Sequence, residues 1–168
     1  MEAPTLDGDR HRSTAAYAAA AWAFVFAAVS FYWALGGRAS VETQALSVRA
    51  QIDDADFIAV LWATGALKLF AGLIALALVR PFGARFPRRP LLLVAWATAG
   101  LLLLYGGAGW VQAGLWETGI QDVPVSVGAK AARWKLIFWE PFWLLGGLLF
   151  GLVAWRFQTR RRPPVQSV

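Results

Sequence analysis

The stretch "WATGALKLFAGLIALALVRP", residues 62–81, decides the fold of this 168-residue chain. Its only charged residues are Lys68 and Arg80, and no acidic residue lies within ten positions of Lys68 on either side. A helix needs about 20 mostly apolar residues to cross roughly 30 Å of hydrocarbon. The stretch therefore predicts a membrane-spanning helix with an ammonium group close to mid-membrane.

Three further segments of the chain are equally apolar. The whole sequence is 58% hydrophobic and contains ten tryptophans, which is above the usual apolar fraction of soluble domains. We predict an all-α integral membrane four-helix bundle, a single domain over residues 1–168, with polar tails at 1–14 and 156–168 and spans at about 15–37, 57–79, 91–113 and 134–155. The first apolar run is too long for a signal-peptide core of about 7 to 15 residues, so we expect a retained helix.

The distribution of basic residues predicts the orientation. If four spans alternate, ten Lys and Arg residues fall on the side of both termini and five on the other side. By the positive-inside rule both termini are cytoplasmic, in a multi-pass protein of the bacterial cytoplasmic membrane. The arginine clusters are expected to set topology and to touch anionic lipid headgroups. We expect membrane lipid as a partner and no nucleic acid.

The residue inventory excludes several kinds of site. The chain has no cysteine and one histidine, His11, which lies between two arginines in the polar N-terminal tail. Disulfides, thiol chemistry, a histidine-based metal site and a Ser-His triad are therefore excluded within one chain. We expect neither a metal nor a cofactor.

Two longer loops are expected outside the membrane. The first, "SVETQALSVRAQIDDADF" at residues 40–57, has apolar residues at helical spacing and Ser40 as an N-cap candidate, which predicts a short amphipathic helix. The second, "GLWETGIQDVPVSVGAKAARWK" at residues 114–135, is predicted to be irregular before the fourth helix. Each loop can be interpreted as a lid or as a plain interfacial linker.

Glu140 is the candidate partner of Lys68. A charge near mid-membrane costs at least about 2.5 to 3.5 kcal/mol and usually faces the bundle interior with a partner or a task. Glu140 lies roughly 9 Å and Lys68 roughly 16 Å below the outer surface, a difference that the lysine stem can span. Pro141 would interrupt the helix beside this acid. In the rival interpretation, Pro141 begins the helix and Glu140 is an interfacial N-cap.

Other polar and aromatic side chains share the outer half of the bundle. Thr98, Tyr105 and Gln112 repeat every seven residues and so lie on one helix face. We predict Glu140, Lys68 and Tyr105 as catalytic residues, in a cavity whose substrate-binding residues are Tyr32, Trp33, Trp62, Thr64, Gln112, Trp139 and Trp143. The alternative is a structural network that only determines helix packing.

Small residues are expected where helices touch. Gly36, Gly37, Gly146, Gly147 and Gly151 are predicted to let helices approach closely, the last two in GxxxG spacing.

Three segments carry a resemblance: "SFYWALGG" at the end of the first span, "LWATGALKLFAGL" in the second and "WEPFWLLGGLLF" in the fourth. Over about residues 15–157 the chain resembles a family of small bacterial, often actinobacterial, four-helix membrane proteins, a domain of unknown function. The resemblance supports four spans and implies no activity. It marks as characteristic Tyr32, Trp33, Gly36, Gly37, Lys68, Glu140 and Trp143.

Three functions fit these features. A carboxylic acid in an aromatic-lined apolar cavity can stay protonated and donate its proton to a lipophilic alkene or epoxide, so we predict a membrane-embedded cyclase or isomerase of an isoprenoid-like substrate. A close Lys68 would oppose this by keeping Glu140 ionised. The alternatives are a non-catalytic lipid-binding, quinone-binding or accessory subunit, and a proton or anion transport component. A channel would need a homo-oligomer.

Overall fold

The computed structural model describes residues 6–159, with side chains from Thr14 onward, and this part of the chain is helical without strands. The long helices are α1 (Leu6–Ala34), α3 (Ala55–Ala77), α4 (Arg88–Glu117) and α6 (Glu140–Gln158). Shorter pieces join them: η1 (Val41–Thr43), α2 (Leu46–Gln51), η2 (Pro81–Arg85), α5 (Ala129–Trp134) and η3 (Lys135–Trp139), the last a π-helical turn.

Four segments are long and apolar enough to cross a membrane: Thr14–Ala34, Ala55–Ala77, Arg88–Glu117 and Ala129–Gln158. The fourth combines α5, η3 and α6 in one uninterrupted run. The structure therefore confirms the prediction of an all-helical protein with four candidate spans. The expected side of each terminus stays a prediction.

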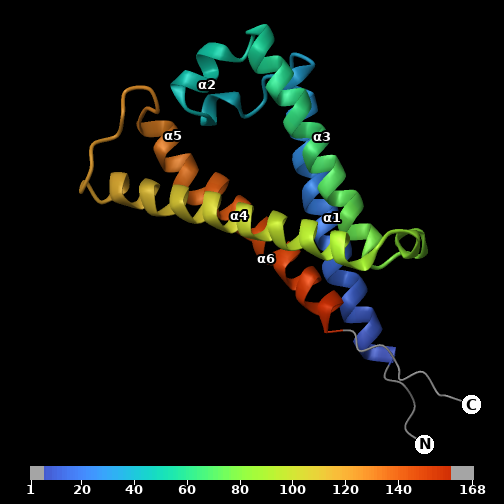
Figure 1. The fold of residues 1–168 in the computed structure, drawn as a ribbon. Helices are drawn as coiled ribbons and strands as arrows, with labels where there is room; N and C mark the ends of the chain where they lie inside the picture. The colour runs from blue at the N-terminus through green and yellow to red at the C-terminus, as the bar shows by residue number, and fades with distance from the viewer. Residues whose placement is uncertain (1–5, 160–168) are drawn as a thin grey trace, which may run out of the picture.

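The long helices form two pairs. Helix α1 packs along α3, and α4 packs along α6, while α1 and α6 join the pairs. Figure 1 shows that the pairs lie close together where α3 turns into α4 and diverge toward α2 and α5. We call the first end, with η2 and the last turn of α6, the arginine-rich end. The opposite end, with residues 35–54 and 118–128, is the loop end.

Glycines allow α4 and α6 to come together closely. A Cβ on Gly106 would lie 2.8 Å from the Cβ of Trp143 and 3.0 Å from the backbone nitrogen of Leu144. A Cβ on Gly147 would lie 2.7 Å from Leu103. The predicted close approach at Gly147 is confirmed, as small residues favour in membrane bundles.

The prediction of a helix contact at Gly36 was wrong. No atom lies within 4 Å of a Cβ placed there, and its φ is +94°. The backbone N–H of Gly37 donates to the carbonyl of Tyr32 and that of Gly36 to the carbonyl of Trp33. This is a helix C-terminus with glycine in the left-handed position, so Gly36 ends α1 instead of packing a neighbouring helix.

The two expected external loops are joined to each other. The backbone N–H groups of Leu46 and Ser47 donate to the carbonyls of Val127 and Ser126, at 3.2 and 2.9 Å. Apolar residues of the first loop are buried against the ends of α1 and α3, as an amphipathic segment requires. We call residues 38–54 together with residues 123–128 the loop cap.

Ser40 does not cap the short helix as predicted. Its φ is 62°, in the left-handed region, and its hydroxyl donates to the carbonyl of Ala39 at 2.6 Å. The segment forms two short helical pieces, η1 and α2, instead of one helix. Turn formation by residues 40–43 competes with a single helix, because Thr43 bonds back to the Ser40 carbonyl through both its N–H and its hydroxyl.

Candidate functional site

Lys68 lies on the face of α3 that meets α1. Gly65 and Gly72, on either side of Lys68, are buried against the rings of Phe31 and Phe24 of α1. The two glycines let the backbones of α1 and α3 approach, and Lys68 emerges at this contact. Its position in Ala55–Ala77 is roughly 20 Å along the helix from the loop end, so the ammonium group is deep in the span.

The ammonium group of Lys68 has neutral partners. Its Nζ donates to the hydroxyl of Ser30 at 2.7 Å, and Ser30 is buried. The same nitrogen lies 4.0 Å from the ring centroid of Phe26 and 5.6 Å from that of Trp143. No ion pair forms between Lys68 and a carboxylate anywhere in the described residues. The faces of aromatic rings attract cations through the ring quadrupole. The rings of Phe26 and Trp143 therefore partly replace a carboxylate as partner of the ammonium group.

Glu140 is buried, with 1% of its surface exposed. Its Oε1 forms an ion pair with Lys135, and its Oε2 has no hydrogen-bond partner among the described residues. The carboxylate packs on Gly109 of α4, where a Cβ would lie 2.5 to 2.6 Å from the carboxylate atoms. The interpretation of Glu140 as a buried residue within the fourth span is confirmed, and the interfacial N-cap interpretation is wrong.

The predicted pairing of Lys68 with Glu140 was wrong, because each group has a nearer partner. The backbone N–H of Glu140 donates to the carbonyl of Lys135, a π-helical bond across five residues. This register brings the Lys135 and Glu140 side chains to one face. Lys135 stands in the sequence five positions before Glu140, and a search at the α-helical spacing of 3.6 residues does not detect such a pair.

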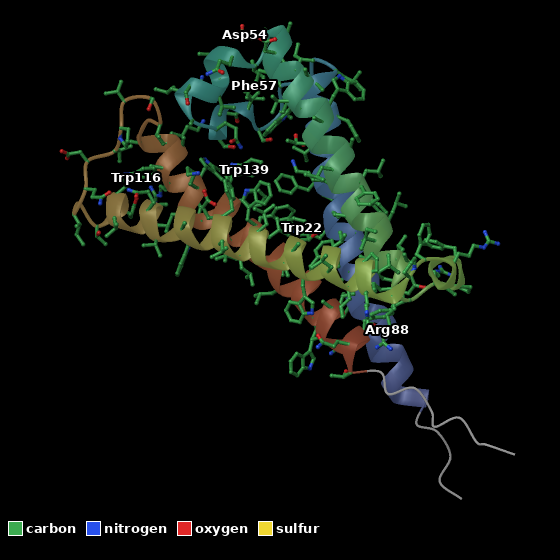
Figure 2. All side chains as sticks on the ribbon, viewed as in Figure 1. Trp22, Asp54, Phe57, Arg88, Trp116 and Trp139 are labelled. Carbon is green, nitrogen blue, oxygen red and sulfur yellow. The ribbon has the colours of Figure 1, made fainter. Side chains whose placement is uncertain are left out.

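An aromatic cluster surrounds Lys68 on the side of α6. It consists of Trp22, Phe26, Trp139, Phe142 and Trp143. The rings of Phe26 and Trp143 are 4.5 Å apart between centroids. The indole N–H of Trp22 donates to the carbonyl of Phe142 at 2.9 Å, and its ring rests on Gly146. Figure 2 shows Trp22 and Trp139 in the angle between the two helix pairs.

Three of the predicted site residues come together in this region. Trp143 lies between Lys68 and Tyr105: its ring is near the ammonium group, and its centroid is 5.0 Å from that of Tyr105. Tyr105 is 56% exposed on the surface of α4. Lys68, Trp143 and Tyr105 therefore make one continuous contact across three helices.

Of the other predicted residues, Trp139 belongs to the aromatic cluster, and the rest lie outside it. Trp139 donates its indole N–H to the Thr43 hydroxyl at 3.0 Å and so joins the cluster to the loop cap. Trp33 donates to the carbonyl of Ala39 at 2.9 Å within the loop end. Four residues make other local contacts: Tyr32 folds onto Gly37, Trp62 packs on Phe31, Thr64 bonds to its own helix, and Gln112 bonds to Gln121.

Residues 23–150 match a family described as "Protein of unknown function (DUF3995)". The chain belongs to this family. The matched range contains Ser30, Lys68, Lys135 and Glu140, and it confirms the resemblance seen in the sequence. No curated protein and no solved structure matches the chain. The family description gives no activity.

Two functional candidates were not found from the sequence. Ser30, the partner of Lys68, is a small polar residue in an apolar helix, and its distance of 38 positions from Lys68 gives no periodic signal. Lys135 was counted among the five Lys and Arg residues on the side opposite the termini, and no contact with Glu140 was predicted for it. Two hollows of about 660 and 410 Å³ are lined by described residues, and neither is lined by Lys68 or Glu140. Phe26 and Trp143 of the aromatic cluster lie against Lys68.

Proposed function

We propose that this protein binds a membrane-soluble ligand with a hydrogen-bond-accepting oxygen, such as an isoprenoid quinone, at Lys68. One observation carries the proposal: an ammonium group deep in a spanning helix has a serine hydroxyl and ring faces as partners, and no carboxylate among the described residues. An ammonium group has three donor hydrogens. Ser30 accepts one, which leaves two for a ligand oxygen.

The energetics favour a role beyond packing. Burial of a lysine at the centre of a span costs at least about 2.5 to 3.5 kcal/mol. A hydrogen bond from a charged group contributes about 1.5 to 3 kcal/mol, and a ring face about 0.5 to 2. Together the favourable terms are of about the same size as the cost of burying the lysine, and an apolar residue at this position would avoid that cost. Ionisable residues inside membranes are typical of functional sites for this reason.

The neighbours of Lys68 favour a flat ligand. The rings of Phe26 and Trp143 stand next to the ammonium group, and the exposed ring of Tyr105 adjoins Trp143. A planar head group can stack on such rings while its oxygen accepts from Lys68. The loop cap contacts the aromatic cluster through Thr43 and Trp139 at the loop end. We therefore propose that the ligand enters from the bilayer, between α3 and α4.

Mass spectrometry of retained compounds tests the binding function. The wild type is purified in mild detergent beside Lys68→Met, which keeps much of the stem and removes the donors. Lys130→Met is the matched control, because Lys130 is exposed in α5. We expect one class of lipophilic oxygen compound in wild type and control that is depleted at least tenfold in Lys68→Met. Identical profiles in all three folded samples would refute the proposal.

A second candidate is acid catalysis by Glu140, as a cyclase or isomerase of an isoprenoid-like substrate. The observation that favours it is the buried Oε2 atom, which has no hydrogen-bond partner among the described residues. In this role the carboxylic acid transfers its proton to an alkene carbon or epoxide oxygen, and ring faces stabilise the resulting cation. The ion pair with Lys135 opposes it, because the Lys135 side chain already occupies Oε1 of the same carboxyl group. Undiminished turnover of isoprenoid substrates by Glu140→Gln would exclude this role.

A further inference from the structure

The turn between α3 and α4 encloses a hollow of about 410 Å³ at the arginine-rich end. Leu78 and Leu91 line it and are buried, so they form its base. Arg80 and Phe86 line it and are exposed, so they form its edge. Phe157, near the end of α6, completes the apolar side. The hollow thus combines an apolar base with a cationic edge, as a lipid headgroup and its first acyl carbons require.

Two arginines, Arg80 and Arg88, are among the residues that line this hollow. Arg88 donates to the carbonyls of Phe157 and Gln158 at 2.6 and 3.3 Å, which holds its charge at the junction of α4 and α6. Arg80 lies over the ring of Tyr17, 5.3 Å from its centroid. Figure 2 places Arg88 at the end of the molecule where α4 meets α1 and α6.

Acidic residues are scarce around these arginines. The sequence has no Asp or Glu between residues 57 and 116, and none after Glu140. The carboxylates nearest in sequence to the start of α1 are Glu2, Asp7 and Asp9, whose side chains lie outside the described part. Arg80 has no ion pair with a carboxylate of the described residues. The positive charge of Arg80 is therefore not neutralised by a carboxylate of the described residues.

The turn is rigid before any ligand arrives. The α-carbon of Gly83 packs directly against the carbonyl of Ala77, which leaves no space for a Cβ. Pro81 and Pro87 restrict the backbone on both sides of η2. A site that is already ordered loses less entropy on binding. Because Arg80 precedes Pro81 and Arg88 follows Pro87, the backbone beside both arginines is restricted.

We propose that this hollow binds the phosphate group of an anionic membrane phospholipid. Arginine binds phosphate oxygens through a planar fork of donors, which makes the contact directional as well as electrostatic. The glycerol and the first acyl carbons would lie along Leu78, Leu91 and Phe157. This site is separate from the one at Lys68, and its existence does not depend on the function proposed there.

Lipid titration of the melting temperature tests the proposal. The purified protein is titrated in detergent with phosphatidylglycerol, phosphatidylcholine or inorganic phosphate. The variants are Arg80→Gln and, as matched control, Arg85→Gln, which removes the same charge from the same turn but does not line the hollow. Arg80→Lys keeps the positive charge but loses the planar set of guanidinium donors. This variant replaces Arg80→Gln in the titration if Arg80→Gln does not fold.

We expect phosphatidylglycerol to raise the melting temperature of the wild type more than phosphatidylcholine does. Arg80→Gln should weaken the apparent affinity about fivefold, the equivalent of about 1 kcal/mol per basic residue at a membrane surface, and Arg85→Gln should not. If Arg80→Gln and Arg85→Gln weakened the apparent affinity for phosphatidylglycerol equally, the lipid would be attracted by the surface charge in general, and the proposed site in the hollow would be refuted. Equal stabilisation by both lipids would overturn anion recognition. If inorganic phosphate raised the melting temperature as much as phosphatidylglycerol does, the ligand would be free phosphate, and the proposal of a phospholipid would be refuted.

Discussion

Gly106→Ala is the substitution that tests the close contact of α4 and α6. The new Cβ would lie 2.8 Å from the Cβ of Trp143, 3.0 Å from the backbone nitrogen of Leu144 and 3.2 Å from the carbonyl oxygen of Glu140. These atoms belong to the backbone of α6 or are bonded directly to it, so side-chain rotation cannot relieve the contact. The two helices must therefore move apart at this contact.

Gly107→Ala provides a matched control on the same helix. Its Cβ would meet only Cδ2 of Leu144, at 3.9 Å, an ordinary contact. Both variants gain the same helix propensity of up to about 1 kcal/mol, so this term cancels in their difference. Overpacking costs about 1 to 3 kcal/mol. We therefore expect Gly106→Ala to be less stable than Gly107→Ala by that amount, or about 2 to 12 °C in melting temperature.

Thermal unfolding in detergent, followed by circular dichroism, measures this difference. Gly147→Ala places a Cβ against Leu103 in the same interface. Because one separation of α4 from α6 relieves both contacts, the double variant with Gly106→Ala should cost less than the sum of the singles. Equal melting temperatures for Gly106→Ala and Gly107→Ala would refute the close contact at Gly106.

Two further variants test the polar contacts of the fourth span. Lys135→Met removes the partner of the buried Glu140 carboxylate and should destabilise the protein by about 3 to 5 kcal/mol. The double variant that also carries Glu140→Gln should regain most of this lost stability in thermal unfolding. An unchanged melting temperature for Lys135→Met would contradict the ion pair. Trp139→Phe removes the N–H that donates to Thr43, so amide exchange in residues 41–52 should accelerate, unlike in Trp134→Phe. Equal exchange in both variants would contradict that link.

The four spans were predictable because hydropathy is a local property. Each span carries enough consecutive apolar residues to be recognised alone, and the structure places long helices at all four. The burial of Glu140 was also predictable, since a span that began at Pro141 would be short for the bilayer. The partners of Lys68 and Glu140 could not be predicted from the sequence. They depend on which helices touch and at what rotation.

Local exceptions to regular geometry account for the errors near the site. A π-helical turn before Pro141 shifts the register by one residue and pairs Lys135 with Glu140. Lys68 reaches Ser30 because Gly65 and Gly72 let α1 approach α3 at that level. Neither relation is visible as a spacing in the sequence.

By itself, the sequence determined that the chain has four helices long and apolar enough to cross a membrane, and that Lys68 and Glu140 lie within two of them. The tertiary structure alone decided that the two charges serve different partners, and that Trp143 stands between Lys68 and Tyr105. The physical reason is that insertion depth depends on apolar residues counted along one helix. Side-chain pairing depends instead on the distance and rotation between helices, and contacts remote in sequence set both.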